Sequence, residues 1–183
     1  PLIIDDDDDP AVDHDFTLMI DDWRLTQDGQ INDASFGSLH DWSHAGRFGN
    51  WLTVNGTSDP VLFAKPSARL RLRLINAANA RIFTLKINGA VATLIAEDGA
   101  ICLPEQTDVV KLAPGQRADL IIDIDRDSII LQEISTGEPY PAGRIITDSN
   151  LSEAQISKTA INLATPPPVA DMSTAKVINV HMQ

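Results

Sequence analysis

The sequence predicts an all-β protein, an antiparallel Greek-key β-sandwich or barrel with one or two short helices. Short runs of alternating apolar and polar residues recur about every 10–12 residues, which is typical of sandwiches and barrels. Gly, Pro, Asn and Asp separate these runs, and helix signals are few. A chain of 183 residues is long enough to bury an independent core without disulfides, and its single cysteine could not form one internally.

The clearest strand covers residues 69–75, where arginine and leucine alternate with the period of a β-strand. The alternation places Leu70, Leu72 and Leu74 on an inward face and Arg69, Arg71 and Arg73 on an outward face. A slip of one residue would bury three guanidinium groups, so the register is strongly specified.

Further strands are expected between turn signals. Residues 83–87 end at Asn88-Gly89, residues 93–96 run into Asp98-Gly99, and residues 120–124 follow Pro114-Gly115, with another strand at 129–134. Asn55-Gly56 is a further turn dipeptide. We also expect Asn76 to cap backbone groups at its strand end, and Arg117 to pair with Asp119 on an outward face.

Two short helices are predicted, one from Asp33 through Ser43 and one from Ser149 or Asn150 through Ser157. The domain organisation expected is an acidic linker from a preceding domain at 1–14, the sandwich at 15–147, and a linker with the first strand of a following domain at 148–183. The end segments hold an aspartate run (5–9), three prolines (166–168) and the apolar stretches PLII and VINV, which we expect to be docked against something. Because the chain starts at Pro1, we expect an excised or processed piece.

Charge excludes one class of function. With 14 Lys and Arg against 26 Asp and Glu, the net charge is −12, which would repel a nucleic acid backbone. No apolar run approaches the length of a membrane span.

No catalytic, cofactor-binding or metal-binding residue is predicted. The histidines are His14, His40, His44 and His181, and none forms a His-x-His pair. His40 and His44 would share a helix face and could chelate a divalent ion weakly, although surface or cap roles are commoner. Cys102 is interpreted as small buried filler, and the aspartate run lacks the spacing of a calcium loop.

The three tryptophans, Trp23, Trp42 and Trp51, favour core or interface packing over a platform for a sugar or an aromatic substrate. No nucleophile elbow, Cys/His partnership or phosphate-binding loop is present.

The order of the segments carries a family resemblance. The series is Asp22-Trp23, Gly46-Arg47-Phe48-Gly49, Val54-Asn55-Gly56, Pro60, Arg69 to Ala77, Ile95 to Gly99, and Leu112 to Asp119. This series resembles the middle, cupredoxin-like domain of a bacterial three-domain multicopper oxidase of the laccase and copper-resistance group, over roughly residues 15–125. PLII and VINVHM resemble the junctions with neighbouring domains.

The resemblance implies a noncatalytic middle domain that positions flanking cupredoxin domains of the same protein. It implies copper in the parent protein, which would couple oxidation of an unknown substrate to reduction of dioxygen, and a periplasmic or extracellular location. In this family the copper ligands come from His-x-His pairs and a His-Cys-His segment that are missing here, so no copper is expected in this segment and the segment alone should be inactive. The alternative is a self-sufficient extracellular β-sandwich binding module that uses the aspartates or tryptophans. A small metalloenzyme using His40 and His44 is a third hypothesis.

Overall fold

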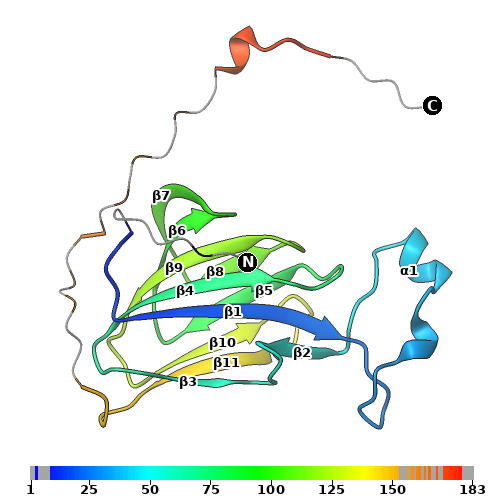
Figure 1. Cartoon of the computed structure of the whole chain (residues 1–183), viewed down its shortest axis with the longest axis horizontal. Coiled ribbons are helices and arrows are strands. Elements are labelled where there is room, and N and C mark those ends of the chain that lie inside the picture. Colours follow the sequence, from blue (N-terminus) through cyan, green and yellow to red (C-terminus); the bar gives the residue numbers. More distant parts are fainter. Residues whose placement is uncertain are drawn as a thin grey trace.

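The computed structural model describes Ile3, residues 9–152, residues 156, 158, 160, 161, 163, 165 and 168, and residues 171–178. Two β-sheets pack face to face, and one loop with a short helix projects from one end (Figure 1). The strands are β1 (His14–Trp23), β2 (Trp51–Val54), β3 (Val61–Ala64), β4 (Arg69–Asn76), β5 (Phe83–Asn88), β6 (Ala92–Glu97), β7 (Ala100–Thr107), β8 (Val109–Leu112), β9 (Arg117–Asp123), β10 (Ser128–Glu133) and β11 (Tyr140–Thr147). The helical elements are the 3₁₀ turns η1 (Asp33–Ser35) and η2 (Met172–Thr174) and the helix α1 (Leu39–Ser43).

The predicted β-sandwich is confirmed. One sheet has the order β2-β1-β4-β9-β6-β7 and the other β3-β11-β10-β5-β8. Both sheets are mixed, whereas the sequence suggested purely antiparallel ones, because β1 pairs parallel with β4 and β3 pairs parallel with β11. Side-chain alternation has the same period in both kinds of pairing, so it cannot distinguish them.

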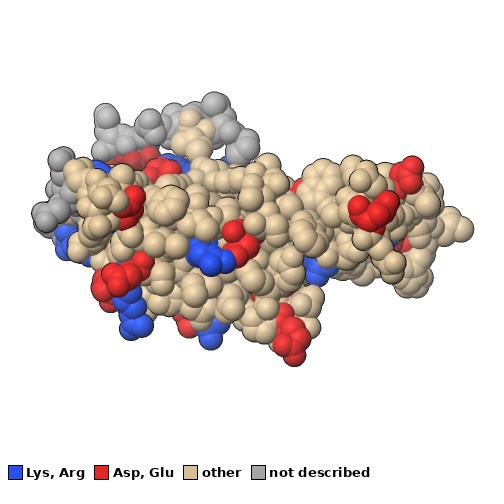
Figure 2. Space-filling model, turned by 90° about the horizontal axis from the view of Figure 1, so that it is seen from below, with Lys and Arg blue, Asp and Glu red and all other residues tan. Residues whose placement is uncertain are grey.

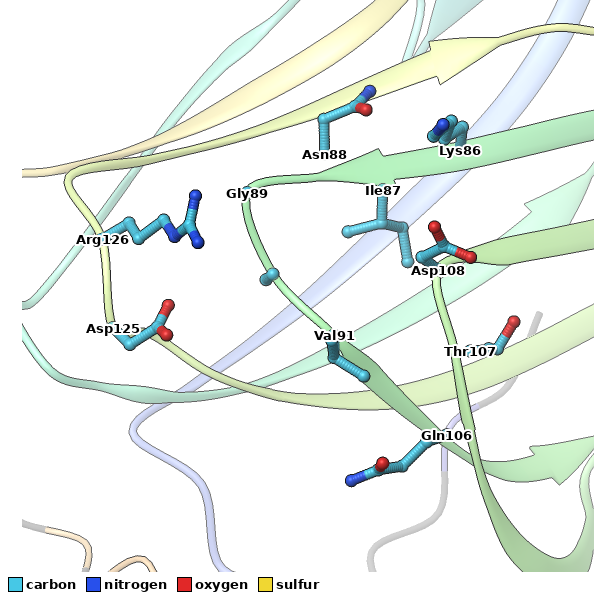
Figure 3. A pocket seen from close by; sticks show the side chains of 11 residues that line it. Lys86, Ile87, Asn88, Gly89, Val91, Gln106, Thr107, Asp108, Asp125 and Arg126 are labelled. Atoms are coloured by element: carbon cyan, nitrogen blue, oxygen red, sulfur yellow. The ribbon is translucent and has the colours of Figure 1, made fainter.

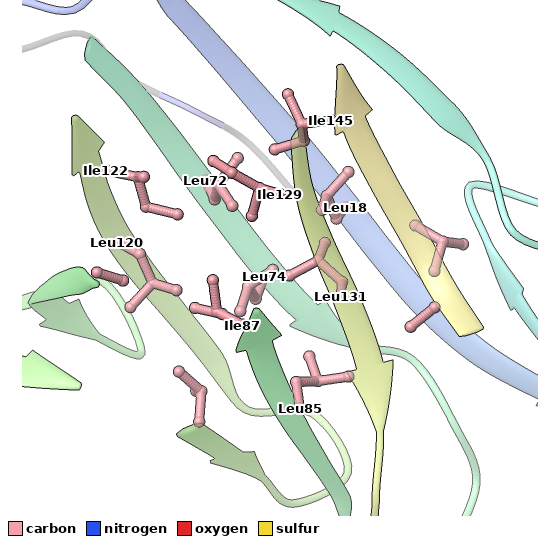
Figure 4. Close-up of a cluster of buried hydrophobic side chains, with 14 of the residues drawn as sticks. Leu18, Leu72, Leu74, Leu85, Ile87, Leu120, Ile122, Ile129, Leu131 and Ile145 are labelled. Atoms are coloured by element: carbon pink, nitrogen blue, oxygen red, sulfur yellow. The ribbon is translucent and has the colours of Figure 1, made fainter. Parts of the chain in front are cut away.

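The core lies between the sheets, and the side chains labelled in Figure 4 are all aliphatic. Phe83 is also fully buried in this core. Leu70, Leu72 and Leu74 are fully buried, as the alternation predicts. They face buried side chains of the second sheet, among them Leu85, Ile87, Ile129, Leu131 and Ile145. Strand β4 therefore supplies one wall of the core.

The three arginines of β4 share its other face, but solvent does not surround them as expected. Arg69 and Arg71 are buried and Arg73 is half-buried, because acidic side chains of neighbouring segments cover them. The ion pairs are Arg69–Asp123 at 2.7 Å, Arg71–Asp119 at 2.6 Å, Arg71–Asp9 at 2.8 Å and Arg73–Asp15 at 2.7 Å. We call these four pairs the arginine ladder. A buried guanidinium is tolerated only when it is paired in this way.

The expected pair between Arg117 and Asp119 is wrong. Asp119 is held by Arg71 and Arg73, while the Arg117 guanidinium donates to the carbonyl oxygen of Asp98 at 2.6 Å. Because β9 lies between β4 and β6, its charged side chains pair with residues of neighbouring strands. The sequence of β9 alone does not indicate these partners.

The local turn predictions are confirmed. Asn55 and Asp98 have φ values of 52° and 50°, and the glycines that follow them are also in the left-handed region. The side-chain amide of Asn76 donates to the backbone carbonyl oxygens of Arg81 and Leu112, and its Oδ1 accepts from the backbone amide of Ala78. The three donor–acceptor distances are 2.8, 2.9 and 2.9 Å. This side chain therefore satisfies three backbone groups where β4 ends.

The helix predictions need correction. Asp33 opens only the single 3₁₀ turn η1, and a separate helix of five residues, α1, follows. Gly37, with a φ of 73°, lies between them and interrupts a continuous helix. Residues 149–152 form turns and bends rather than a helix, and 153–155 and 157 lie outside the described residues.

The chain ends touch the sandwich at a few points. The Ile156 amide donates to Asp13 and the Lys158 ammonium donates to the Ile124 carbonyl oxygen at 2.7 Å. Ile3, Val177 and Ile178 are exposed in this chain, so these members of PLII and VINV do not pack into its sandwich. Their docking against another segment or domain stays a prediction. The remaining residues of both stretches, most of the aspartate run and Pro166 and Pro167 lie outside the described residues. The assignment of 1–14 and 148–183 to neighbouring domains stays a prediction.

We predict that Leu72→Ala lowers the free energy of unfolding by about 2–5 kcal/mol, because a fully buried leucine leaves a cavity. The matched control is Leu103→Ala on β7, where the leucine is exposed and the expected change is within about 0.5 kcal/mol. Urea unfolding of both variants measures this. Equal effects at the two positions would contradict the described core.

We predict that Asp123→Asn destabilises the chain near neutral pH, with a difference that shrinks in acid. The hydrogen bond from Arg69 holds the pKa of the Asp123 carboxyl below its ordinary value. The stabilisation is therefore complete above the unfolded-state pKa of about 3.9 and is lost as the pH falls through the lower folded-state pKa. Because the carboxylate is partly exposed, the effect at neutral pH should be about 1 kcal/mol or less. Urea midpoints from about pH 7 down to pH 2 check this, and a difference that grows in acid would contradict it.

Candidate interaction site at the end of the sandwich

Residues 24–50 leave the sandwich between β1 and β2 and carry η1 and α1; we call them the excursion (Figure 1). Trp23 at the end of β1 is paired with Trp51 at the start of β2, so the excursion departs and returns at one place. Asn50 closes its base, since the Asn50 side chain accepts from the Leu25 amide at 2.8 Å and donates to the Leu25 carbonyl oxygen at 2.9 Å. The excursion is therefore a closed loop on a fixed base.

A buried ion pair anchors this base to the rest of the domain. Asp22, whose side chain is 2% exposed, accepts from Arg81 at 2.7 Å and from the Gly49 amide at 2.6 Å. Arg81 also donates to the Gly49 carbonyl oxygen at 2.7 Å. The second carboxylate oxygen of Asp22 is buried and has no partner within the described part of the chain. Removing Arg81 would leave a buried carboxylate unpaired, which is costly.

A second ion pair holds the excursion together internally. Arg24 donates to both carboxylate oxygens of Asp41, at 2.8 and 3.1 Å, and this bond keeps the pKa of Asp41 below its ordinary value. Arg47 donates to the Ser35 hydroxyl at 2.6 Å and lies over the Phe36 ring at 4.3 Å. Arg24, Asp41 and Arg47 thus face one another inside the excursion, whereas Asp28 and Asp33 are exposed.

Large apolar side chains of the excursion and its base face solvent instead. They are Trp23, Ile31, Phe36, Leu39, Trp42, Phe48 and Trp51, and we call them the apolar rim. In the view of Figure 2 the excursion is a lobe beside the sandwich, with most of its visible surface free of charged residues. Packing of the tryptophans in this domain's own core is excluded by their exposure, and interface packing stays a prediction. An exposed apolar group of this size is typical of an interaction surface.

Two hollows accompany these features. One of about 210 Å³ lies at the base of the excursion and is lined by Asp22, Trp51, Arg81, Glu133 and Tyr140, among others. The other, of about 560 Å³, lies at the far end of β5, where Lys86, Asn88, Thr107, Asp125 and Arg126 surround it (Figure 3). The charges of this larger hollow have both signs, and no charged side chain that lines it is buried. The larger hollow therefore shows no preorganised binding site.

The structure brings His40 and His44 together, as their spacing predicts. Their rings are stacked with centroids 4.3 Å apart, and both residues are exposed. His14 is structural, since its Nε2 accepts from the Lys65 amide at 3.0 Å and burial lowers its pKa. His181 lies outside the described residues.

Cys102 is half-buried on β7 rather than fully buried. Burial, together with Glu97, raises the pKa of its thiol, so that the reactive thiolate is disfavoured.

The described residues do not offer a copper centre with three or more protein ligands. Among them, no three His, Cys, Asp or Glu side chains gather closely enough to hold a metal ion. The four histidines of the full sequence include no His-x-His pair. No helix in the described ranges is long and apolar enough to cross a membrane.

Comparison with known proteins identifies the family. The profile of the family "Multicopper oxidase" matches residues 14–130. The chain belongs to the multicopper oxidase family. It is 34% identical over 149 residues to "Multicopper oxidase LPR1 homolog 5" of Oryza sativa subsp. japonica, covering 78% of this chain and 22% of that protein. It is 35% identical over 122 residues to "Cell division protein FtsP" of Edwardsiella tarda, covering 65% of this chain and 25% of that protein.

A solved structure confirms the cupredoxin-type sandwich. The laccase-like multi-copper oxidase CueO of Ochrobactrum sp. superimposes with a TM-score of 0.74 at 24% identity, over 88% of this chain and 37% of that one. This multicopper oxidase chain thus spans roughly a quarter of the two named relatives and less than two fifths of that solved structure.

Sequence reasoning missed the two ion pairs that hold the excursion. The Asp22-Trp23 and Gly46 to Gly49 segments were noted only as family signatures, and nothing in the sequence pointed to Arg81 as the partner of Asp22. These residues are 59 positions apart: Asp22 lies near the end of β1, and Arg81 lies in the connection that follows β4, the sheet neighbour of β1.

We predict that Gly49→Ala destabilises the chain by several kcal/mol. A Cβ at Gly49 would lie 2.6 Å from the backbone of Asp22 and Trp23, which cannot move away without breaking the base. The control is Gly29→Ala in the excursion, where a Cβ meets open space and only the φ of 78° opposes it, at about 1 kcal/mol. Thermal unfolding distinguishes the two, and a milder effect at position 49 than at 29 would contradict the described base.

Proposed function

We propose that this chain is the noncatalytic middle domain of a multicopper oxidase and positions flanking copper-bearing domains of the same protein. The observation that carries the proposal is a complete sandwich of the family's fold whose sequence has no ligand motif of the family's copper sites. The chain matches only a fraction of the oxidase structures, which leaves room for domains that would carry copper. The proposed location of the parent protein is periplasmic or extracellular.

The apolar rim is the surface that we assign to domain contacts. Its aromatic and aliphatic side chains are those that dominate buried interfaces, and the inward-facing ion pairs hold them on a fixed base. A separate binding module is the second candidate, favoured by the exposure of Trp23, Trp42 and Trp51. One relative is named as a cell division protein, so the oxidase activity of the parent requires its own test.

We predict that the separately produced chain, after treatment with EDTA, retains no stoichiometric copper and oxidises no phenol. The longer parent protein, treated identically, should retain copper and oxidise the phenol. Elemental analysis and an oxidation assay measure this. Retention of about one copper per isolated chain, with the strong blue absorption of a copper thiolate that disappears in Cys102→Ser, would contradict the noncatalytic role.

The positioning role is tested by Leu39→Ser in the parent protein and in the isolated chain. We expect it to lower the thermal stability of the parent by a few degrees and to leave the isolated chain unchanged, because Leu39 would be covered only in the parent. Leu103→Ser is the matched control, with a leucine of nearly the same exposure on β7. An effect of Leu39→Ser that is equal in parent and isolated chain would contradict a domain contact at the rim.

A further inference from the structure

We propose that His40 and His44 form a divalent metal site of the Cu²⁺ and Zn²⁺ class on the excursion, separate from the copper centres of the family. His40 lies in the first turn of α1 and His44 directly follows its last residue, so the two imidazoles project from one face. Their rings are stacked at 4.3 Å with 22° between the planes. The proposal does not depend on the role of the domain within its parent.

Hydrogen bonding prepares His44 to act as a ligand. Its Nδ1 lies 2.9 Å from the Ser43 hydroxyl and 3.2 Å from the His40 carbonyl oxygen. Because a carbonyl oxygen only accepts, this contact favours the tautomer in which Nδ1 carries the hydrogen and the lone pair of the neutral ring lies on Nε2. Metal-binding histidines are oriented in the same way, with the other ring nitrogen donating to a backbone oxygen.

The surroundings leave both rings accessible to an ion. His40 and His44 are exposed, and side chains on a surface rotate within nanoseconds, which allows the His40 ring to turn towards an ion at the Nε2 of His44. The nearby Asp41 carboxylate is occupied by Arg24 and Arg47 and does not complete the site. The site therefore has two imidazole ligands, with water in the remaining positions, and exchanges its ion readily.

The probe is Cu²⁺ alone, which binds nitrogen ligands most strongly among the common divalent ions. Trp42 lies between the two histidines in the sequence and is exposed, so a bound Cu²⁺ should quench its fluorescence. The experiment titrates the EDTA-treated 183-residue chain with Cu²⁺ and follows the fluorescence, with Trp42→Phe to identify the tryptophan that responds. A Zn²⁺ titration followed by the imidazole proton signals repeats the test without quenching.

We expect saturable binding of one ion, weakened about 100-fold in either His40→Ala or His44→Ala, because each change turns a chelate into a single ligand. His181→Ala is the control and should bind as the unchanged chain does. Undiminished binding in both excursion variants, or loss in His181→Ala, would overturn the proposal. EDTA removes an ion from this exposed site, whereas the test of the scaffold role measures only the copper that remains bound after EDTA treatment. Failure of the metal-site proposal would therefore leave the test of the scaffold role unaffected.

Discussion

Strand β4 must satisfy two opposite demands on its two faces, and most of the fold depends on how it does so. Its leucines need an apolar core, which the second sheet supplies, and its arginines need acidic partners, which β1, β9 and Asp9 supply. Each guanidinium can be shielded from solvent because it forms an ion pair with a carboxylate. An unpaired buried charge would cost several kcal/mol. The arginine ladder thus fixes which strands flank β4 and in which register.

The strand and turn assignments could be predicted from the sequence because they depend on neighbouring residues. The Arg/Leu alternation of β4, the Asn55-Gly56 turn and the cap at Asn76 are local signals that the structure reproduces. Parallel pairing of β1 with β4 and the burial of Arg69 depend on residues that are distant in the chain. The Arg117–Asp119 pair was wrongly predicted for the same reason. Both residues lie on β9, whereas the actual partners of Asp119, Arg71 and Arg73, lie on β4.

The candidate site was less predictable than the fold. The spacing of His40 and His44 predicted that their rings lie close together. The contacts of His44 Nδ1 could not be predicted, because they depend on the geometry of the last turn of α1. The tryptophans were expected in a core or an interface, and only their position around the base of the excursion excludes this domain's own core. Exposure depends on what covers a side chain, which a sequence pattern does not record.

In this account the sandwich around β4 is stable by itself, and the excursion is a loop of lower local stability attached to it. Native-state hydrogen exchange of the EDTA-treated chain tests this most directly, because it ranks the stability of each element. We expect the amides of β4 and β9 to exchange only through global unfolding, and those of α1 to exchange faster. Exchange of β4 as rapid as that of α1 would show that the sandwich is not stable in this chain by itself, and would contradict the account.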